Sequence, residues 1–295
     1  MLVMNQISQI AIPLENLFAP GEAPDASKAN PMVIGIQVAY RYPFLPQPVL
    51  VEILGSRVQL SYPAASNRAK AEAERLAKRA ARRASNGDCH RAIAIWERVL
   101  KLVPDNLVAH RDIGMAWLEL GDFAKAKRHL SDALLIDFED VGSLVALADI
   151  AVKQEDYGAA EVFARKGVTA GPQDAWALNC LGTVLFYTER HEEALSLFRA
   201  AIVSDPEFAP PYSALACLHH QLGRHAEAEA TLRAMFAEAK RQDIRGRTGF
   251  RTRKNVLPHG PGITGREPRP RGQPEGGGVP PSGGGAHRLP DPSGG

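Results

Sequence analysis

The sequence has only three cysteines, Cys89, Cys180 and Cys217, in 295 residues. An odd and widely spaced set of this kind provides neither a disulfide framework nor the close cysteine pairs of a structural zinc site. Aromatic residues are scarce at 6%, which favours closely packed helices over a sheet sandwich. The net charge of +2 is too small to indicate that the whole chain binds nucleic acid or a membrane surface.

Long hydrophobic runs are missing as well. No stretch approaches the roughly 18 consecutive apolar residues of a membrane span. The opening segment, MLVMNQISQIAIPLENLF, has no Lys or Arg, and polar residues interrupt its apolar run, so it does not resemble a signal peptide. We therefore expect a soluble, cytoplasmic protein with no membrane partner.

Catalytic and metal-binding motifs are lacking too. The chain has no GxxxxGK[ST], GxSxG or HExxH segment, and HEEAL at 191–195 lacks the second histidine of a metalloprotease helix. His219 and His220 are adjacent, and neighbouring helical residues point about 100° apart, so the two do not readily share one metal ion. We expect no enzymatic activity, no cofactor, no metal and no small-molecule substrate.

What the chain does contain is a repeat of 34 residues. Pro172 and Pro206 are 34 residues apart, and so are Gly87 and Gly121. Five consecutive frames begin at residues 73, 107, 141, 175 and 209, and "place" below means the position within a frame. Places 8 and 20 are always small: Ala80, Gly114, Ala148, Gly182 and Ala216, then Ala92, Ala126, Ala160, Ala194 and Ala228.

Small residues at two fixed places indicate helices that cross closely, because a bulky side chain there would hold two backbones apart. Larger apolar residues three and four positions away complete the amphipathic helix pattern. We expect Gly182 and Ala194 to touch across the fourth frame. Gly87, Gly121 and Gly223 mark the turn inside a helical hairpin, and Pro104, Pro172 and Pro206 end its second helix.

This pattern resembles the tetratricopeptide repeat family over residues 73–240. The resemblance implies an all-α fold, a right-handed α-solenoid of about five helix-turn-helix repeats. The expected repeats are 73–106, 107–140, 141–174, 175–208 and 209–240, within an array over 67–243. Some positions depart from the family pattern, such as Arg79 and Arg83 in the first frame, Ala164 in the third and Lys240 in the fifth.

The two ends of the chain differ from the array. Residues 1–66 are expected to form a flexible segment followed by a small β-rich or irregular element, with a hairpin turn at Gly55–Ser56. This element would be either docked on the array or the remnant of a larger domain. Residues 244–295 are rich in Gly, Pro and Arg and are expected to be disordered. Their composition fits an arginine- and glycine-rich binding segment and equally a translated shifted reading frame, so we assign them no function.

Residues 67–85 are helical in composition and carry seven Lys or Arg against two Glu. A basic helix that binds RNA or acidic lipid is one interpretation. We favour a terminal helix whose outer face meets water because no repeat precedes it, so nucleic acid is not the expected partner.

The resemblance also implies where a partner would bind, because in this family the first helices of the repeats line a concave groove. Mapping the family's groove places onto this sequence gives a predicted binding set. Its members are Arg111, Met115, Asp149, Trp176, Asn179, Thr183, Phe186, Tyr187 and His220. Three aromatic residues in one frame are notable because aromatic side chains dominate binding energy at interfaces. The alternative is that Trp176 or Phe186 packs between repeats.

We therefore expect an interaction scaffold that holds a protein or peptide in its groove. Two other functions stay open: an accessory repeat domain of a larger enzyme whose catalytic part lies upstream, and nucleic-acid binding through residues 67–83 and the tail. Repeat five ends with Leu232, Met235 and Phe236 and no following amphipathic helix, so self-association through it is also expected.

Overall fold

The computed structural model of this chain describes residues 7–18, 23–24 and 30–247. The chain divides into two units, residues 1–261 and 262–295, and every described residue belongs to the first. The expected disordered tail therefore lies outside the described residues from 248 onward. Helix α11 (His225–Arg247) continues into the first four positions of the segment that we expected to be disordered.

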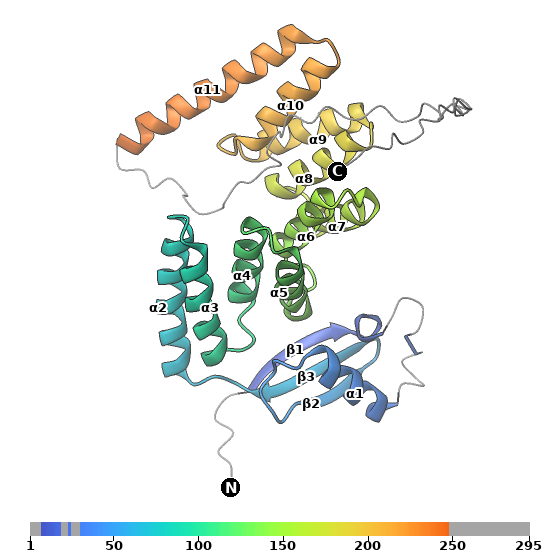
Figure 1. Cartoon of the computed structure of the whole chain (residues 1–295). Helices are drawn as coiled ribbons and strands as arrows, with labels where there is room; N and C mark the ends of the chain where they lie inside the picture. The colour runs from blue at the N-terminus through green and yellow to red at the C-terminus, as the bar shows by residue number, and fades with distance from the viewer. Residues whose placement is uncertain (1–6, 19–22, 25–29, 248–295) are drawn as a thin grey trace, which may run out of the picture. The chain divides into compact units, whose positions relative to one another are not determined.

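Most of the described chain is a series of antiparallel helical hairpins (Figure 1). Each hairpin packs on the next along the sequence, which confirms the α-solenoid of five repeats. The hairpins are α2 (Asn67–Ala84) with α3 (Cys89–Leu102), α4 (Leu107–Glu119) with α5 (Phe123–Ile136), α6 (Val141–Lys153) with α7 (Tyr157–Ala170), α8 (Ala175–Tyr187) with α9 (His191–Ser204), and α10 (Pro210–Gln221) with α11.

The turn inside each hairpin has the same backbone conformation at place 15. Gly87, Gly121 and Gly223 have φ angles of 79°, 78° and 72° there. The third and fourth hairpins reach the same left-handed region with Glu155 and Glu189, at 61° and 62°. Because only glycine adopts this conformation without steric cost, the two glutamates hold it under strain.

The helix ends follow from caps and prolines. The carboxylates of Asp122, Asp140 and Asp174 accept hydrogen bonds from backbone N–H groups in the first turns of α5, α6 and α8. Pro172 and Pro206 lie two residues beyond the ends of α7 and α9, as the sequence predicted.

The two helices of a hairpin pack closely at the small residues, as the sequence predicted. A β-carbon added to Gly182 would lie 2.7 Å from Cε1 of Phe198, and one added to Gly114 would lie 2.6 Å from Cγ of Leu130. The three atoms nearest to this added β-carbon at Gly182 all belong to Phe198, the large residue at place 24. In the third hairpin both places are small, and Ala148 and Ala164 are fully buried. The expected contact of Gly182 with Ala194 stays a prediction.

The N-terminal part forms its own small α/β unit with a core. Strands β1 (Ile7–Pro13), β2 (Leu50–Leu54) and β3 (Arg57–Pro63) make an antiparallel sheet in the order β1-β3-β2. A short 3-10 helix, η1 (Leu14–Leu17), follows β1, and helix α1 (Pro31–Arg41) lies across one face of the sheet (Figure 1). Its core combines side chains from the strands and α1, among them Ile12, Ile34, Val38, Val58 and Leu60.

This unit confirms the hairpin and corrects the rest of the expectation. Leu54 pairs with Arg57, so Gly55–Ser56 is the two-residue turn. Residues 7–17, expected to be flexible, form β1 and η1, because β1 pairs with β3 and its Ile10 and Ile12 are buried. The branched residues after Pro31 form a helix, since the Asn30 side chain caps it and Pro31 occupies its first turn.

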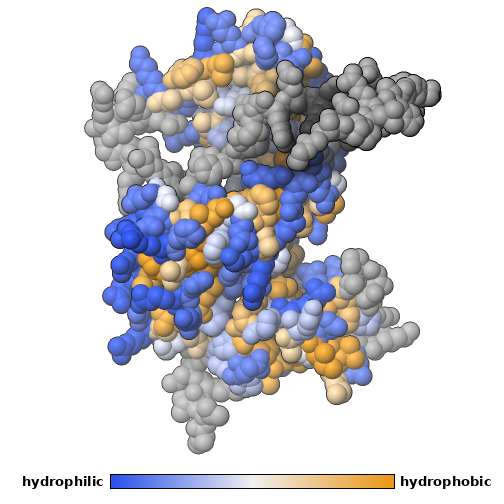
Figure 2. All heavy atoms as spheres, in the orientation of Figure 1, coloured by the Kyte–Doolittle hydropathy of each residue, from blue (hydrophilic) through white to orange (hydrophobic). Residues whose placement is uncertain are grey.

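Polar and apolar residues gather on different parts of the surface (Figure 2). All seven basic residues of α2 are exposed, as expected for a terminal helix that meets water. Apolar side chains instead gather over α1, where Met32, Ile36 and Tyr40 are exposed at helical spacing. No helix within the described ranges is long and apolar enough to cross a membrane.

Candidate binding groove

The predicted binding residues lie on the first helices of four successive repeats. Helix α8 contributes five of the nine, and α4, α6 and α10 contribute the others. The structure separates them by exposure: Tyr187 and His220 are exposed, Arg111, Met115, Asp149, Trp176 and Phe186 are half-buried, and Asn179 and Thr183 are buried.

Tyr187 is the most exposed aromatic side chain of the set, with 42% of its surface accessible. Its ring stacks on Tyr157, at the start of α7, with centroids 5.6 Å apart and planes 21° apart. Phe186 meets the Tyr187 ring edge-on at 5.5 Å. The last turn of α8 and the start of α7 therefore form an aromatic cluster, defined here as Tyr157, Phe186 and Tyr187. The cluster is open to solvent at Tyr187.

Electrostatics show which other groups face this cluster. Partial burial raises the pKa of the Tyr187 hydroxyl, and Tyr157, Cys217 and Asp149 raise it further. These groups come from α6 and α7 of the third repeat and from α10 of the fifth, the two repeats on either side of Tyr187. Asp149 also forms an ion pair with Lys153, with 3.8 Å between Oδ1 and Nζ.

Trp176 and Phe186 have a packing role as well. Both lie against the large core around Phe198 and Leu218, and the Phe186 ring is 6.3 Å from His191. The sequence left open whether these two residues face the groove or pack between repeats. The structure gives both a substantial part in the packing.

Asn179 and Thr183 lie under the groove surface, at 3% and 6% exposure. The Thr183 hydroxyl donates to the backbone carbonyl of Asn179 over 2.9 Å. The Asn179 Oδ1 is buried and accepts no hydrogen bond from any residue that the structure describes. A buried acceptor without a partner is costly, which makes this atom a place where a bound donor would be favoured.

Arg111, a member of the predicted binding set, is half-buried and pairs with acidic side chains. Its Nη1 donates to Oδ1 of Asp140 over 2.9 Å, and its Nε lies 3.7 Å from Asp112. The side chain also packs on Gly142, where an added β-carbon would lie 2.6 Å from the Arg111 Cδ. Arg111 therefore ties the second repeat to the third.

Met115 and His220 complete the set. Met115 packs against the cluster around Leu130 and Ile150, so it belongs mainly to the interior. His220 is exposed on α10, with its ring 5.0 Å from that of His225. The structure thus concentrates the accessible part of the predicted set on α8 and α10.

Tyr157 is a member of the cluster that the sequence analysis missed. The family's groove places are all on first helices, whereas Tyr157 begins a second helix. The available signal was an aromatic residue directly after the cap Asp156, one repeat before the aromatic pair of α8.

The cysteines show no sign of a nucleophile. Cys89 Sγ donates to Glu119 over 2.9 Å, and burial together with this carboxylate raises the pKa of its thiol to about 12. Complete burial raises the pKa of Cys180 as well, with Asp149 contributing. Burial also raises the pKa of Cys217. All three are therefore thiols at neutral pH, and a thiol is a weak nucleophile.

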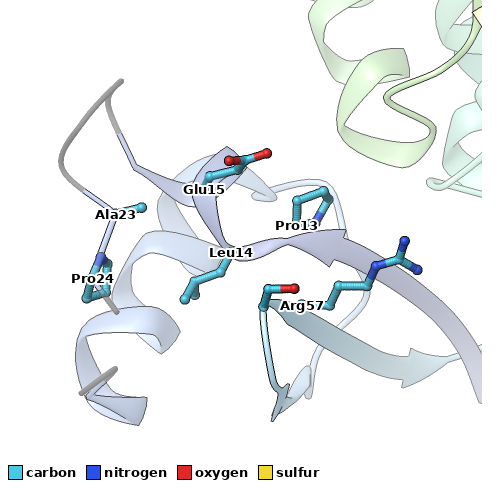
Figure 3. Close-up of a pocket in the computed structure, with 7 residues that line it drawn as sticks. Pro13, Leu14, Glu15, Ala23, Pro24 and Arg57 are labelled. Carbon is cyan, nitrogen blue, oxygen red and sulfur yellow. The ribbon is translucent and has the colours of Figure 1, made fainter. Parts of the chain in front are cut away.

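A pocket of about 440 Å³ lies at the end of β1, next to the β2–β3 turn (Figure 3). Pro13, Leu14, Ala23 and Pro24 form much of its wall. Its charged groups are one carboxylate, Glu15, and one guanidinium, Arg57, and its described lining contains neither histidine nor cysteine. We assign no chemistry to it.

Comparison with known proteins agrees with this fold. The chain is 28% identical over 120 residues to the Arabidopsis thaliana Protein CTR9 homolog, a match that covers 39% of this chain and 11% of that protein. The thermophilic TPR protein TTC0263 of Thermus thermophilus superposes with a TM-score of 0.53 at 20% identity, covering 60% of this chain and 97% of that one. Pseudomonas aeruginosa PilF gives 0.52 at 14% identity, covering 58% and 78%. At these identities the two structures share the fold.

Two sequence models, both described as Tetratricopeptide repeat, match the chain. One matches residues 83–148 and 185–247, and the other matches 145–210. Together they span 83–247, which is more than half of the chain and contains nearly all of the five hairpins. Such repeats generally act as protein-interaction scaffolds, and their fold is typically non-catalytic. The chain belongs to the tetratricopeptide repeat family.

Proposed function

We propose that this protein is a scaffold that holds a peptide or helix of a partner protein in the groove lined by α4, α6, α8 and α10. The observation that carries the proposal is the aromatic cluster of Tyr157, Phe186 and Tyr187. Tyr187 leaves 42% of its surface exposed although its ring is stacked on Tyr157. A rigid aromatic side chain gives a large contact area at a low cost in conformational entropy.

The surroundings of the cluster suggest how a partner is held. An apolar partner side chain would cover the open face of Tyr187, and a longer segment would reach Trp176 at the other end of α8. The Asn179 Oδ1 lies on the same helix, buried and without a hydrogen-bond partner among the described residues, and would take a donor from the partner protein after a small rearrangement. Arg111 and Met115 stay in the packing between repeats and are not part of the proposed contact.

The test is quantitative affinity capture with mass spectrometry, comparing the native chain with Tyr187→Ala. Tyr40→Ala is the matched control, because Tyr40 is 82% exposed on α1, outside the array. Interface aromatic residues commonly contribute about 2 kcal/mol or more, so a groove partner should bind Tyr187→Ala at least ~10-fold more weakly, and Tyr40→Ala normally. Helical circular dichroism should be the same for all three proteins.

Two outcomes would contradict the proposal. One is a partner that binds Tyr187→Ala and the native chain equally, which would place recognition outside the groove. The other is partner binding that is lost at moderate salt concentration and is competed away by free nucleic acid. That result would point to the basic helix α2 instead.

A further inference from the structure

Two histidines and an aspartate that the proposed function does not use meet inside the second repeat. His110 lies on α4, and His129 and Asp132 lie on α5. Their nitrogen and oxygen ligand atoms all lie within 4.8 Å of one another. The His110 Nδ1 is 3.7 Å from a carboxylate oxygen of Asp132, and the two imidazole rings are 5.8 Å apart.

The hairpin itself produces this arrangement. His110 occupies place 4, where the next three repeats have Leu144, Leu178 and Tyr212 and use the side chain for the core. His129 and Asp132 are three residues apart on α5 and therefore share one face of that helix. The antiparallel packing of α4 on α5 brings this face over His110.

Hydrogen bonding fixes the state of His110. Its Nε2 lies 3.1 Å from the backbone carbonyl of Pro104, so Nε2 carries the proton and donates it. The Nδ1 therefore keeps its lone pair and faces Asp132. A metal-binding histidine almost always donates its other ring N–H to a carboxylate, a backbone carbonyl or water, and the Pro104 carbonyl takes that place here.

The cluster contains ring nitrogens that take part in no hydrogen bond with the part of the chain that the structure describes. The Nδ1 atoms of both His110 and His129 are buried and have no hydrogen-bond partner within the described ranges. Burial lowers the pKa of His110, and burial with the neighbouring His110 lowers that of His129 to about 4. Burial raises the pKa of Asp132 to about 6, although Arg128 opposes the shift.

We propose that His110, His129 and Asp132 form a site for a divalent transition-metal ion of the zinc class. Neutral imidazoles and a carboxylate suit Zn²⁺, which binds three protein ligands and leaves a fourth position for water or another ligand. Mg²⁺ and Ca²⁺ prefer oxygen ligands throughout, and soft ions prefer thiolates, which the cluster does not contain.

A metal ion here would join the two helices of the second repeat. The Phe44 ring lies 5.2 Å from that of His110 and covers one side of it. Asp132 keeps 22% of its side chain exposed and gives the ion a route in. The ion would therefore act on the stability of this hairpin, far along the sequence from the aromatic cluster of α8.

The experiment uses the full chain without a polyhistidine tag, treated with chelator and titrated with ZnCl₂ by calorimetry. We expect one Zn²⁺ per chain and a higher unfolding temperature with Zn²⁺ present, because an ion that binds only the native state stabilises it. His129→Ala and Asp132→Asn should each weaken binding at least ~10-fold, since even outer-shell changes cost 10–100-fold. His225→Ala, which alters the exposed His220–His225 pair, is the matched control and should bind normally.

Substitution of Co²⁺ for Zn²⁺ gives a second readout that does not depend on stability. The native chain should develop the visible absorption of a low-coordinate Co²⁺ site, and Asp132→Asn should change its shape. His110 is left unaltered because it is 3% exposed and part of the packing. Circular dichroism of the metal-free variants separates loss of a ligand from loss of the fold.

Three results would overturn the proposal. They are the absence of stoichiometric Zn²⁺ binding, unchanged affinity in both His129→Ala and Asp132→Asn, and binding that only His225→Ala removes. The last result would place the ion at the His220–His225 pair on α10 and α11.

Discussion

At the level of single residues, the helix crossings leave no room for one more carbon atom. Gly114 and Gly182 face Leu130 and Phe198, whose side chains fill the space that a β-carbon would need. The third repeat has Ala148 and Ala164 at the same two places, and both are fully buried. In the second and fourth repeats, glycine at place 8 therefore leaves room for a large side chain at place 24.

We expect Gly182→Ala to lower the free energy of unfolding by about 1–3 kcal/mol, the usual cost of overpacking. The reason is the distance of 2.7 Å from the new β-carbon to Cε1 of Phe198, whose ring is fully buried. Thermal and denaturant unfolding followed by circular dichroism measure the effect.

Gly35→Ala is the control for this substitution. Gly35 lies within α1 and has no atom within 4 Å of an added β-carbon. Alanine should therefore stabilise α1 slightly, by about 0.4–1 kcal/mol, because it restricts the unfolded chain. Equal destabilisation by both substitutions would show that close contact at Gly182 is not the cause.

Residue-level details of the groove were only partly predictable. The 34-residue period assigns a side chain to a helix face, and Tyr187 and His220 are indeed exposed on the expected helices. The period does not tell how deeply the neighbouring repeat covers that face, which is why Asn179 proved buried. Nor does it show that Asp140 engages Arg111, since this contact depends on side-chain geometry between two repeats.

At the level of elements, the hairpin turns share one backbone conformation but not one residue. Gly121 has the left-handed φ angle that glycine allows, while Glu155 adopts the same region with a side chain. The sequence predicted the turns that contain glycine and did not predict the two that contain glutamate. A conformation required by the packing of the two helices was imposed there on a residue that disfavours it.

Exchanging the two turn residues should therefore have opposite effects. Gly121→Glu should destabilise the protein by about 1–2 kcal/mol, the cost of left-handed conformation for an L-residue. Glu155→Gly should be neutral or stabilising by up to ~1 kcal/mol, since relief of strain exceeds the entropy lost by glycine. Urea midpoints at constant slope measure both, and destabilisation by Glu155→Gly would contradict the account.

The elements of the N-terminal unit were harder to predict for a different reason. The array is built from contacts between neighbouring segments, so the local period reveals it. Strand β1 becomes a strand because it pairs with β3, and in the register Ile7 lies opposite Pro63. No pattern within seven residues specifies such a distant partner, and the segment therefore looked flexible.

At the level of the whole molecule, the last repeat exposes apolar surface. Leu232 and Phe236 are one helical turn apart on α11, and they are 38% and 67% exposed. A repeat buries each face only against a neighbour, so an exposed pair of this kind favours association with another copy. Self-association through repeat five remains a prediction.

We expect the double substitution Leu232→Glu and Phe236→Glu to reduce any dimer and to raise solubility. Sedimentation velocity at several concentrations is the measurement. Val203→Glu is the control, because Val203 is 81% exposed on α9, outside this pair. A native chain that is monomeric at every concentration would show that the exposed pair does not drive association.

The pairing of β1 with β3 also bears on the order in which the molecule folds. Each helical hairpin closes within one repeat of 34 residues, whereas the sheet must bring Ile7 to Pro63. Distant contacts form more slowly than local ones, because chain entropy is lost before the contact is gained. During synthesis β1 leaves the ribosome first and waits for β3, with Ile10 and Ile12 still exposed to water. In that interval the strand presents apolar side chains to any chaperone that binds nascent chains.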